Sequence, residues 1–265
     1  MKTLSVYIVV ALFYLCHGGP GNASTTSDPT TWSELEQICV KSEVDSKRIS
    51  DIIERCKKID LNPSQTYEML VPVFETCREG LPLDYPVSKL EEGLAKGVSS
   101  DRISSAVKTR LEYMLISREM AESIGEKMTS DAVIVASARA MESGIHKNDI
   151  RTVLEEGKTR ETREVTYLLE AGENLRLSGF ESEELTPMLV DCMKRNLRRL
   201  EIRRLVRYAT QQRKRGMDAG TIRESIWGNG GNGATERYRK EGDSGNGDGF
   251  GPGPGDAHSH RHGRP

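Results

Sequence analysis

Residues 179–194, GFESEELTPMLVDCMK, contain the pattern that decides the fold. Apolar side chains follow Phe180 at offsets of 5, 8, 9 and 12 residues, at Leu185, Met188, Leu189 and Cys192. At about 100° per residue these positions fall within one arc roughly 100° wide, the width of a buried helical stripe. Gly179 stands immediately before the pattern, where a residue with positive φ ends a preceding helix without a Cβ penalty. The stretch therefore predicts the end of one helix and the start of the next.

The same pattern recurs six times along the chain. The six segments open at Val44, Leu61, Val98, Ile145, Phe180 and Met217. In each segment we expect apolar or small residues at offsets +5, +8, +9 and +12, on one buried stripe. A glycine directly precedes four of the openings, at Gly97, Gly144, Gly179 and Gly216. From Leu61 onward the openings lie 35 to 47 residues apart, room for one helical hairpin each. The sequence therefore predicts an all-α fold of stacked helical hairpins, an α-solenoid-like repeat.

Capping residues support these helix starts. Four good N-caps follow their openings by one residue: Asp45, Asn62, Ser99 and Asp218. Pro63 suits the first helical position, and Gln65 stands where the partner of a capping box reaches back. His146 and Glu181 are weaker caps, so those two starts depend more on the apolar pattern. Return helices are expected over residues 131–141 and 160–177.

The two ends of the chain differ in composition from its middle. Residues 1–23 resemble a signal peptide, because Lys2 precedes an apolar run from Leu4 to Leu15 that is too short for a membrane span. Cleavage fits after Gly18 or Ala23, with an uncleaved anchor and lipidation at Cys16 as alternatives. We expect residues 24–31 to be a linker, 32–227 the helical repeat domain, and 228–265 a disordered Gly-rich tail with histidines. The mature protein is then secreted or periplasmic.

Positive charge is concentrated in one segment, although the formal net charge of the chain is only -2. Between Lys194 and Arg215 basic residues dominate, and Arg199 and Arg203 are the candidate contacts for an acidic partner, an anionic membrane surface or an envelope polymer. The alternative is a solvated helix face over a core of Leu197, Leu200, Leu205, Val206 and Ala209. Because only Tyr208 is interleaved with the basic residues, we expect no nucleic-acid binding.

Four cysteines remain outside the signal segment: Cys39, Cys56, Cys77 and Cys192. Cys56 and Cys192 both occupy the +12 position of the stripe, which predicts buried thiols. A disulfide among Cys39, Cys56 and Cys77 is the alternative, because all three fall in the first helical hairpins and export would expose them to oxidising conditions.

Residues suited to metal binding gather in the tail, where His258, His260 and His262 alternate along the chain. Imidazole is a suitable ligand for zinc, nickel or copper, but a His-rich end also chelates metal adventitiously. Within residues 32–227 the only histidine is His146, and no nucleophile elbow or HExxH motif accompanies it. We therefore expect neither enzymatic activity nor a cofactor.

The segment GLPLDYPVSKLEEGLAKGVSSDR, residues 80–102, resembles the signature of an uncharacterised bacterial family of secreted helical-repeat proteins. The match covers Gly-Leu-Pro at 80–82 and Glu-Gly-Leu-Ala-Lys-Gly-Val at 92–98; it departs where Val87 precedes Lys89 by two residues. The resemblance implies a signal peptide, helical repeats and a Gly-rich end, but no activity. Within this segment Gly93 interrupts a helix, which costs about 1 kcal/mol relative to Ala. Either a neighbouring helix packs over Gly93, or Lys89, Glu92 and Lys96 line a binding site beside it.

Taken together, these patterns predict a non-enzymatic interaction or scaffold module that acts outside the cytoplasm on an envelope protein or polymer. The alternatives are a metal-binding or metal-buffering protein that uses the histidines of its tail, and an enzyme whose motif is not recognisable. The identity of the partner and the oligomeric state do not follow from the residues.

Overall fold

The structure is a computed structural model that describes residues 28–41 and 46–228. Over these residues the chain forms eleven α-helices and one short 3₁₀ helix, with no strand. The helices are α2 (Trp32–Lys41), α3 (Ser46–Lys58), α4 (Pro63–Arg78), α5 (Asp84–Ala95), α6 (Ser100–Ile124), η1 (Glu126–Met128), α7 (Asp131–Glu142), α8 (Lys147–Gly157), α9 (Thr162–Leu177), α10 (Ser182–Lys194), α11 (Arg199–Lys214) and α12 (Ala219–Trp227). The predicted all-α class is confirmed, and α7 and α9 are the two expected return helices.

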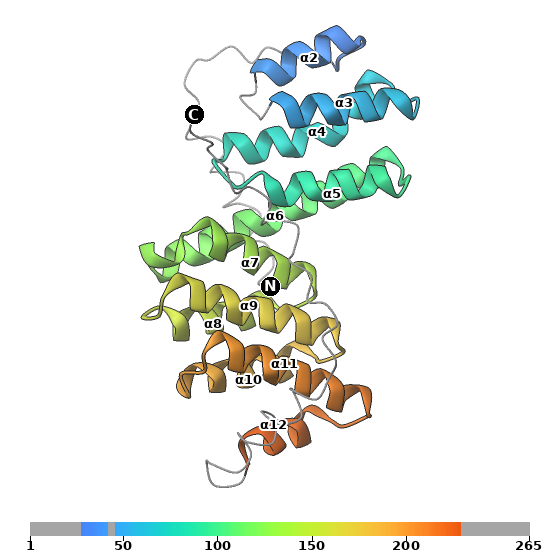
Figure 1. Ribbon diagram of the computed structural model, residues 1–265. Helices are drawn as coiled ribbons and strands as arrows, with labels where there is room; N and C mark the ends of the chain where they lie inside the picture. The colour runs from blue at the N-terminus through green and yellow to red at the C-terminus, as the bar shows by residue number, and fades with distance from the viewer. Residues whose placement is uncertain (1–27, 42–45, 229–265) are drawn as a thin grey trace, which may run out of the picture.

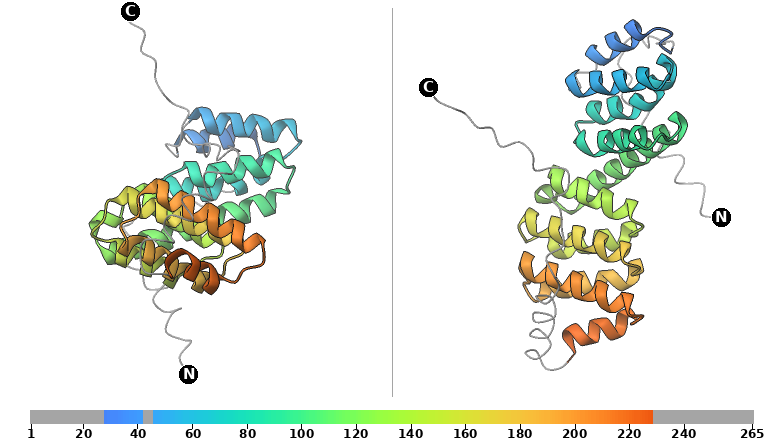
Figure 2. Two further views of the ribbon diagram at one scale, coloured as in Figure 1. Left: turned by 60° about the horizontal axis from the view of Figure 1, so that its bottom comes forward. Right: turned by 45° about the vertical axis from the view of Figure 1, so that its right-hand side comes forward.

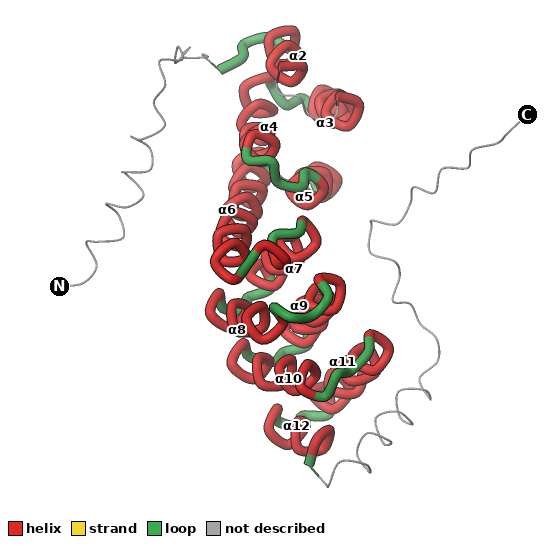
Figure 3. The backbone as a smooth tube through the Cα atoms, turned by 90° about the vertical axis from the view of Figure 1, so that its left-hand side faces the viewer, coloured by secondary structure: helices red, strands yellow, loops and turns green. Residues whose placement is uncertain are grey.

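The helices are stacked in two rows, which confirms the predicted hairpin stack (Figure 1). The even-numbered helices α2 to α12 form one row and the odd-numbered helices α3 to α11 form the other (Figure 3). Both rows bow in the same direction, and the odd row lies on the inner side of the bow. This inner row gives the protein a concave face.

The turns between helices share one geometry. Seven helices end in a Schellman turn, in which an apolar residue donates its backbone N–H to the carbonyl five residues earlier. The donors are Leu61, Leu81, Val98, Ile145, Phe180, Leu197 and Met217. The residue before each donor has positive φ, and it is a glycine at every turn except those with Asp60 and Asn196. Five of the predicted openings are thereby confirmed, Val44 lies outside the described residues, and the turns at Leu81 and Leu197 were not predicted.

Helices begin two residues after the confirmed openings, and side chains cap several of them. Asn62 and Gln65 form the predicted capping box, with Asn62 Oδ1 2.8 Å from the N–H of Gln65. Asp218 likewise accepts from the N–H of Thr221 at 2.9 Å. Ser99 takes the N-cap position but makes no side-chain cap hydrogen bond. Asp45 lies outside the described residues.

Most positions of the predicted stripes are buried. In the segment that opens at Phe180, all five positions from Phe180 to Cys192 are at most 3 % exposed. Met217, by contrast, is 36 % exposed at its opening. The predicted apolar or small residue at +12 is wrong in the segment that opens at Val98, where Arg110 occupies that position. The +12 position of the last segment, Asn229, lies outside the described residues.

The longest helix, α6, connects the upper and lower layers of the stack (right-hand view of Figure 2). Ile103 and Val107 pack in the core of α2–α5, and Leu111 and Met114 in a small middle core. Met120 and Ala121 pack in the core that continues to α12. α5 and α7 are the only successive neighbours within a row, among the described helices, that lack close backbone packing. The continuity of the stack between α5 and α7 therefore depends on α6.

One of the predicted core positions on α11 is wrong. Leu200 was expected in the core, but it is 57 % exposed, because Ile202 takes the inward position on α11 instead. Leu205, Val206 and Ala209 are buried as expected.

Cys39, Cys56, Cys77 and Cys192 are free thiols, so the structure contains no disulfide among them. Burial raises the pKa of Cys39 to about 11 and that of Cys192 to about 12, which keeps both as thiols.

No helix in the described part of the chain is long and apolar enough to span a bilayer. The predicted signal segment and nearly all of the predicted tail, with His258, His260 and His262, lie outside the described residues. Their assignments stay predictions.

Candidate interaction site

The segment that carries the family resemblance places Lys89, Glu92 and Lys96 on one face of α5. Lys89 pairs with Glu92 at 3.3 Å, and Lys96 pairs with the same carboxylate. These hydrogen bonds from Lys96 and Lys89 lower the pKa of Glu92. Beside them, a Cβ added at Gly93 would lie 2.6 Å from a side-chain carbon of Ile103 on α6. Gly93 therefore serves the close packing of α5 on α6.

A second cluster of charges is centred on Arg110 at the junction of α5, α6 and α7. The Arg110 side chain is only 12 % exposed and binds both carboxylate oxygens of Glu142, at 3.2 and 3.0 Å from Nε. It also donates to the carbonyl of Tyr85 at 2.6 Å and lies 4.1 Å from the centre of the Tyr85 ring. The Tyr85 hydroxyl donates to Glu142, and burial followed by this carboxylate raises the pKa of Tyr85. Because every charge in this cluster has a partner, the cluster connects the three helices. It leaves little hydrogen-bonding capacity for a ligand.

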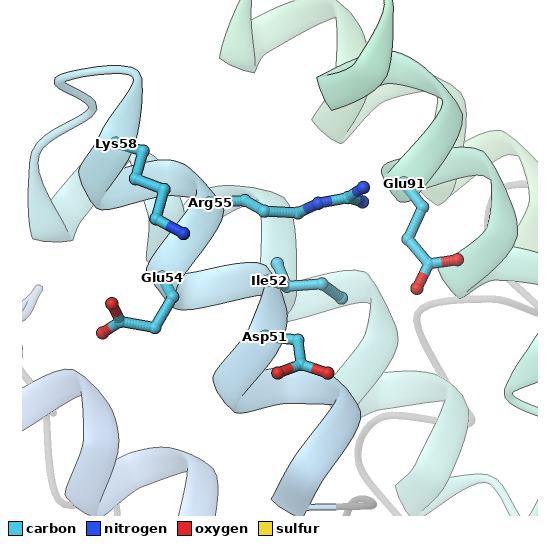
Figure 4. A pocket seen from close by; sticks show the side chains of 6 residues that line it. All are labelled: Asp51, Ile52, Glu54, Arg55, Lys58 and Glu91. Carbon is cyan, nitrogen blue, oxygen red and sulfur yellow. The ribbon is translucent and has the colours of Figure 1, made fainter.

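Between α3 and α5 lies an open pocket of about 430 Å³ (Figure 4). Its charged lining residues are Asp51, Glu54, Arg55, Lys58 and Glu91. Arg55 extends across the opening toward α5, where Glu91 points away from it. Three carboxylates and two cations line this pocket, so neither sign of ligand is strongly favoured.

A cleft of about 290 Å³, here called the arginine cleft, lies between α9 and α11 of the inner row and α10 of the other row. Its lining comprises Arg160, Glu161, Arg163, Glu164, Tyr167, Leu168, Cys192, Met193, Leu197, Arg198, Arg199 and Ile202. The positively charged side chains come from the starts of α9 and α11. Those starts lie side by side because successive helices of one row run in the same direction.

Tyr167 holds two guanidinium groups in place at this cleft. Arg199 lies 4.1 Å from the centre of the Tyr167 ring, within the range of a cation–π contact. Arg163 lies 5.5 Å from the same centre, and its Nε donates to the Tyr167 hydroxyl at 3.0 Å. That hydrogen bond is the main cause of the raised pKa of Arg163. The ring thus gathers two positive charges from different helices.

Several of these arginines lack a carboxylate partner. Arg160 pairs with Glu164 at 3.3 Å, whereas Arg163, Arg198 and Arg199 form no ion pair with any carboxylate of the described residues. Four arginines and two glutamates line the cleft, which leaves an excess of positive charge. The arrangement favours a ligand that brings negative charge.

The floor and the margin of the cleft are less polar. Leu168, Met193 and Ile202 are buried beneath it, and Leu200, which follows Arg199 in sequence, is exposed. One turn of α9 further along, Glu170 is about half buried and accepts no side-chain hydrogen bond in the described structure. Burial raises its pKa, and the nearby charges of Arg139 and Arg199 oppose that rise.

The sequence located this site only in part. Arg199 was predicted as a contact residue and lines the cleft, whereas Arg203 lies further along α11 and is not among the lining residues. Arg163, Tyr167 and Arg198 were missed. The local signals were the arginine-rich start of α9 for Arg163 and the basic segment from Lys194 to Arg215 for Arg198. Neither signal predicts the cleft, because it depends on the pairing of helices more than thirty residues apart.

Among the residues that the structure describes, no group of His, Cys, Asp and Glu side chains is placed to bind a metal ion. No family model, curated protein or solved structure matches the chain. The resemblance of residues 80–102 to secreted helical-repeat proteins therefore stays a prediction.

Proposed function

We propose that the protein is a non-enzymatic interaction scaffold that is secreted or periplasmic and captures an acidic partner of the cell envelope. The carrying observation is the arginine cleft, where Tyr167 gathers guanidinium groups that have no carboxylate partner among the described residues. The arginines and Tyr167 of the cleft lie in α9 and α11 of the inner row or just before them, and stacked helical repeats bind partners along such extended surfaces. The signal-like residues 1–23 support the location.

The proposal is tested by affinity capture from envelope extract of the native host. The full chain is compared with a double variant, Arg163→Glu with Arg199→Glu, and with Arg102→Glu. Arg102 is an exposed arginine near the start of α6 in the other row, so its reversal changes the net charge without altering the cleft. We expect the same partners on the full chain and on Arg102→Glu, and their loss from the double variant.

Equal capture by all three proteins would contradict the proposal. A further arm removes the tail histidines through His258→Ala, His260→Ala and His262→Ala, with and without a chelator. Loss of the partners in this arm alone would favour the metal-binding alternative.

A further inference from the structure

The arginine cleft combines two features that one ligand has to match. Positive charge lies on its two sides, at Arg163 on α9 and at Arg198 and Arg199 on α11. Apolar side chains lie between and below them, including Leu168 and Ile202. A simple inorganic anion satisfies only the first feature.

We infer that the arginine cleft binds an extended acidic peptide that carries one apolar side chain between its carboxylates. This inference rests on the proposed scaffold function and names the chemistry of the partner segment. The volume of about 290 Å³ lies just below the range for small-molecule sites, and it has room for one or two side chains. The apolar side chain enters the cleft and the neighbouring carboxylates reach the arginines.

The exposed Leu200 supports the apolar part of the ligand. Its sequence neighbours Arg198 and Arg199 both line the cleft, yet the Leu200 side chain is 57 % exposed. The helix buries Ile202, Leu205 and Val206 and therefore has no need of Leu200 for its core. Leu200 is thus exposed apolar surface on α11 that the core of this helix does not use.

A peptide fits this location better than a membrane does. Tyr167 and the arginines line a cleft of about 290 Å³, whereas a bilayer presents a broad, nearly flat surface. A single extended chain fits such a cleft, since its successive residues rise by about 3.3 Å and its side chains alternate in direction. The ring also fixes Arg163 and Arg199 beforehand, which reduces the ordering cost of binding.

The test uses fluorescence anisotropy with the full chain and a labelled peptide, Gly-Glu-Asp-Leu-Glu-Asp-Gly. We expect salt-sensitive binding, because exposed charges are screened over about 10 Å at 0.1 M salt. Arg163→Glu with Arg199→Glu should weaken binding roughly ten-fold or more, while Arg102→Glu should leave it unchanged. A peptide with Ser in place of Leu should bind roughly ten-fold more weakly, because a leucine side chain gains that much from burial.

Circular dichroism of each variant establishes that it is folded, and Arg199→Ala serves as a milder variant if the double reversal unfolds. Equal binding of the Leu and Ser peptides would overturn the apolar part of the inference. Unchanged peptide binding in the folded double variant would overturn the site, as would binding to phosphatidylglycerol vesicles but not to the peptide. If no peptide binds while the double variant still loses its envelope partners, the inference fails and the scaffold proposal stands.

Discussion

Arginines join neighbouring layers of the stack in two ways. After α6, Arg213 on α11 donates to the carbonyl of Gly179 at 2.9 Å and to that of Met217 at 3.4 Å. Arg176 on α9 binds the equivalent carbonyls of Gly144 and Phe180, at 3.4 and 3.0 Å. Before α6, Arg48 on α3 binds carboxylates of α5, including Glu91 at 3.0 Å. Arg176 and Arg213 thus bind backbone carbonyls at turns in addition to the carboxylates of Glu181 and Glu184, whereas Arg48 binds α5 through ion pairs.

This comparison separates two kinds of connection between layers. The last carbonyls of a helix lack partners within it, so an arginine from the next layer satisfies groups that need a donor. A partly exposed ion pair replaces contacts that water already provides, and it typically contributes about 0–1 kcal/mol. We therefore expect the carbonyl contacts of Arg176 and Arg213 to depend less on salt than the ion pair of Arg48 does.

The largest expected effect follows from placing a charge in the C-terminal core. Leu189 is 3 % exposed, and Leu189→Asp should cost several kcal/mol, a large part of a stability of about 5–15 kcal/mol. We expect this variant to lose cooperative unfolding in a thermal melt followed by circular dichroism. Glu183→Lys, on the exposed side of the same helix, is the control; similar melting temperatures for the two would mean that the repeat register is wrong.

The next largest effect concerns the junction, where Arg110→Met removes the cation from the cluster with Glu142. We expect the free energy of unfolding to fall by about 2 kcal/mol. This is less than the 3–5 kcal/mol lost when a fully buried pair is broken, because the Glu142 side chain is 31 % exposed. Trp32 packs against the first core and Trp227 against the last, so variants that retain only one tryptophan report on the two ends separately.

In urea titrations of Arg110→Met the transitions seen by Trp32 and Trp227 should move apart. Arg102→Met removes an exposed cation from the same helix and should leave them unchanged. Coincident, unshifted transitions in Arg110→Met would show that the cluster does not hold the two halves together.

Smaller effects should distinguish the two uses of arginine. Arg213→Lys keeps the charge but loses the planar guanidinium group that reaches two carbonyls. We expect the free energy of unfolding to fall by about 1 kcal/mol, at low and at high salt. Arg48→Lys should cost less, and the difference from wild type should vanish as salt screens the pair. Urea unfolding at low and high salt measures the stability of both variants. Equal salt dependence would contradict the difference between carbonyl contacts and surface ion pairs.

The smallest effect is expected at Glu170, whose pKa is raised chiefly by burial. A carboxyl group with a raised folded-state pKa favours folding below its unfolded pKa and loses that contribution as pH rises through the folded value. Glu170→Gln should therefore raise the melting temperature slightly at pH 7 and leave it unchanged well below pH 4.5, the ordinary value for this group. Glu183→Gln on an exposed position is the matched control; a lower melting temperature for Glu170→Gln at pH 7 would contradict the prediction.

The sequence predicted the local features well because they depend on neighbouring residues. Gly179 with Phe180 marks a turn and a helix start through backbone conformation and an apolar contact only a few residues away. The turn at Asn196 was missed because asparagine takes the left-handed conformation less often than glycine does, so the residue alone did not indicate it.

Features that depend on other layers were not predictable in the same way. Arg110 occupies a stripe position because Glu142 and Tyr85 approach from two other helices, and Leu200 is exposed because the rotation of α11 places Ile202 inward. The arginine cleft likewise exists only once Tyr167 of α9 lies beside Arg199 of α11. The pattern of residues in a single sequence does not predict which side chains of different helices meet.

The repetition of the arginine contacts also bears on how such a chain can lengthen. Residues 145–179 run from one Schellman opening to the glycine before the next, and Arg176 within them binds Gly144 on the preceding layer and Phe180 on its own. A duplicate of this unit inserted before Phe180 would present a glycine carbonyl to each copy of Arg176 and an apolar opening at each new turn. The array can therefore grow by one hairpin through a single tandem duplication. No further substitutions are needed to form the contacts between the new layer and its neighbours.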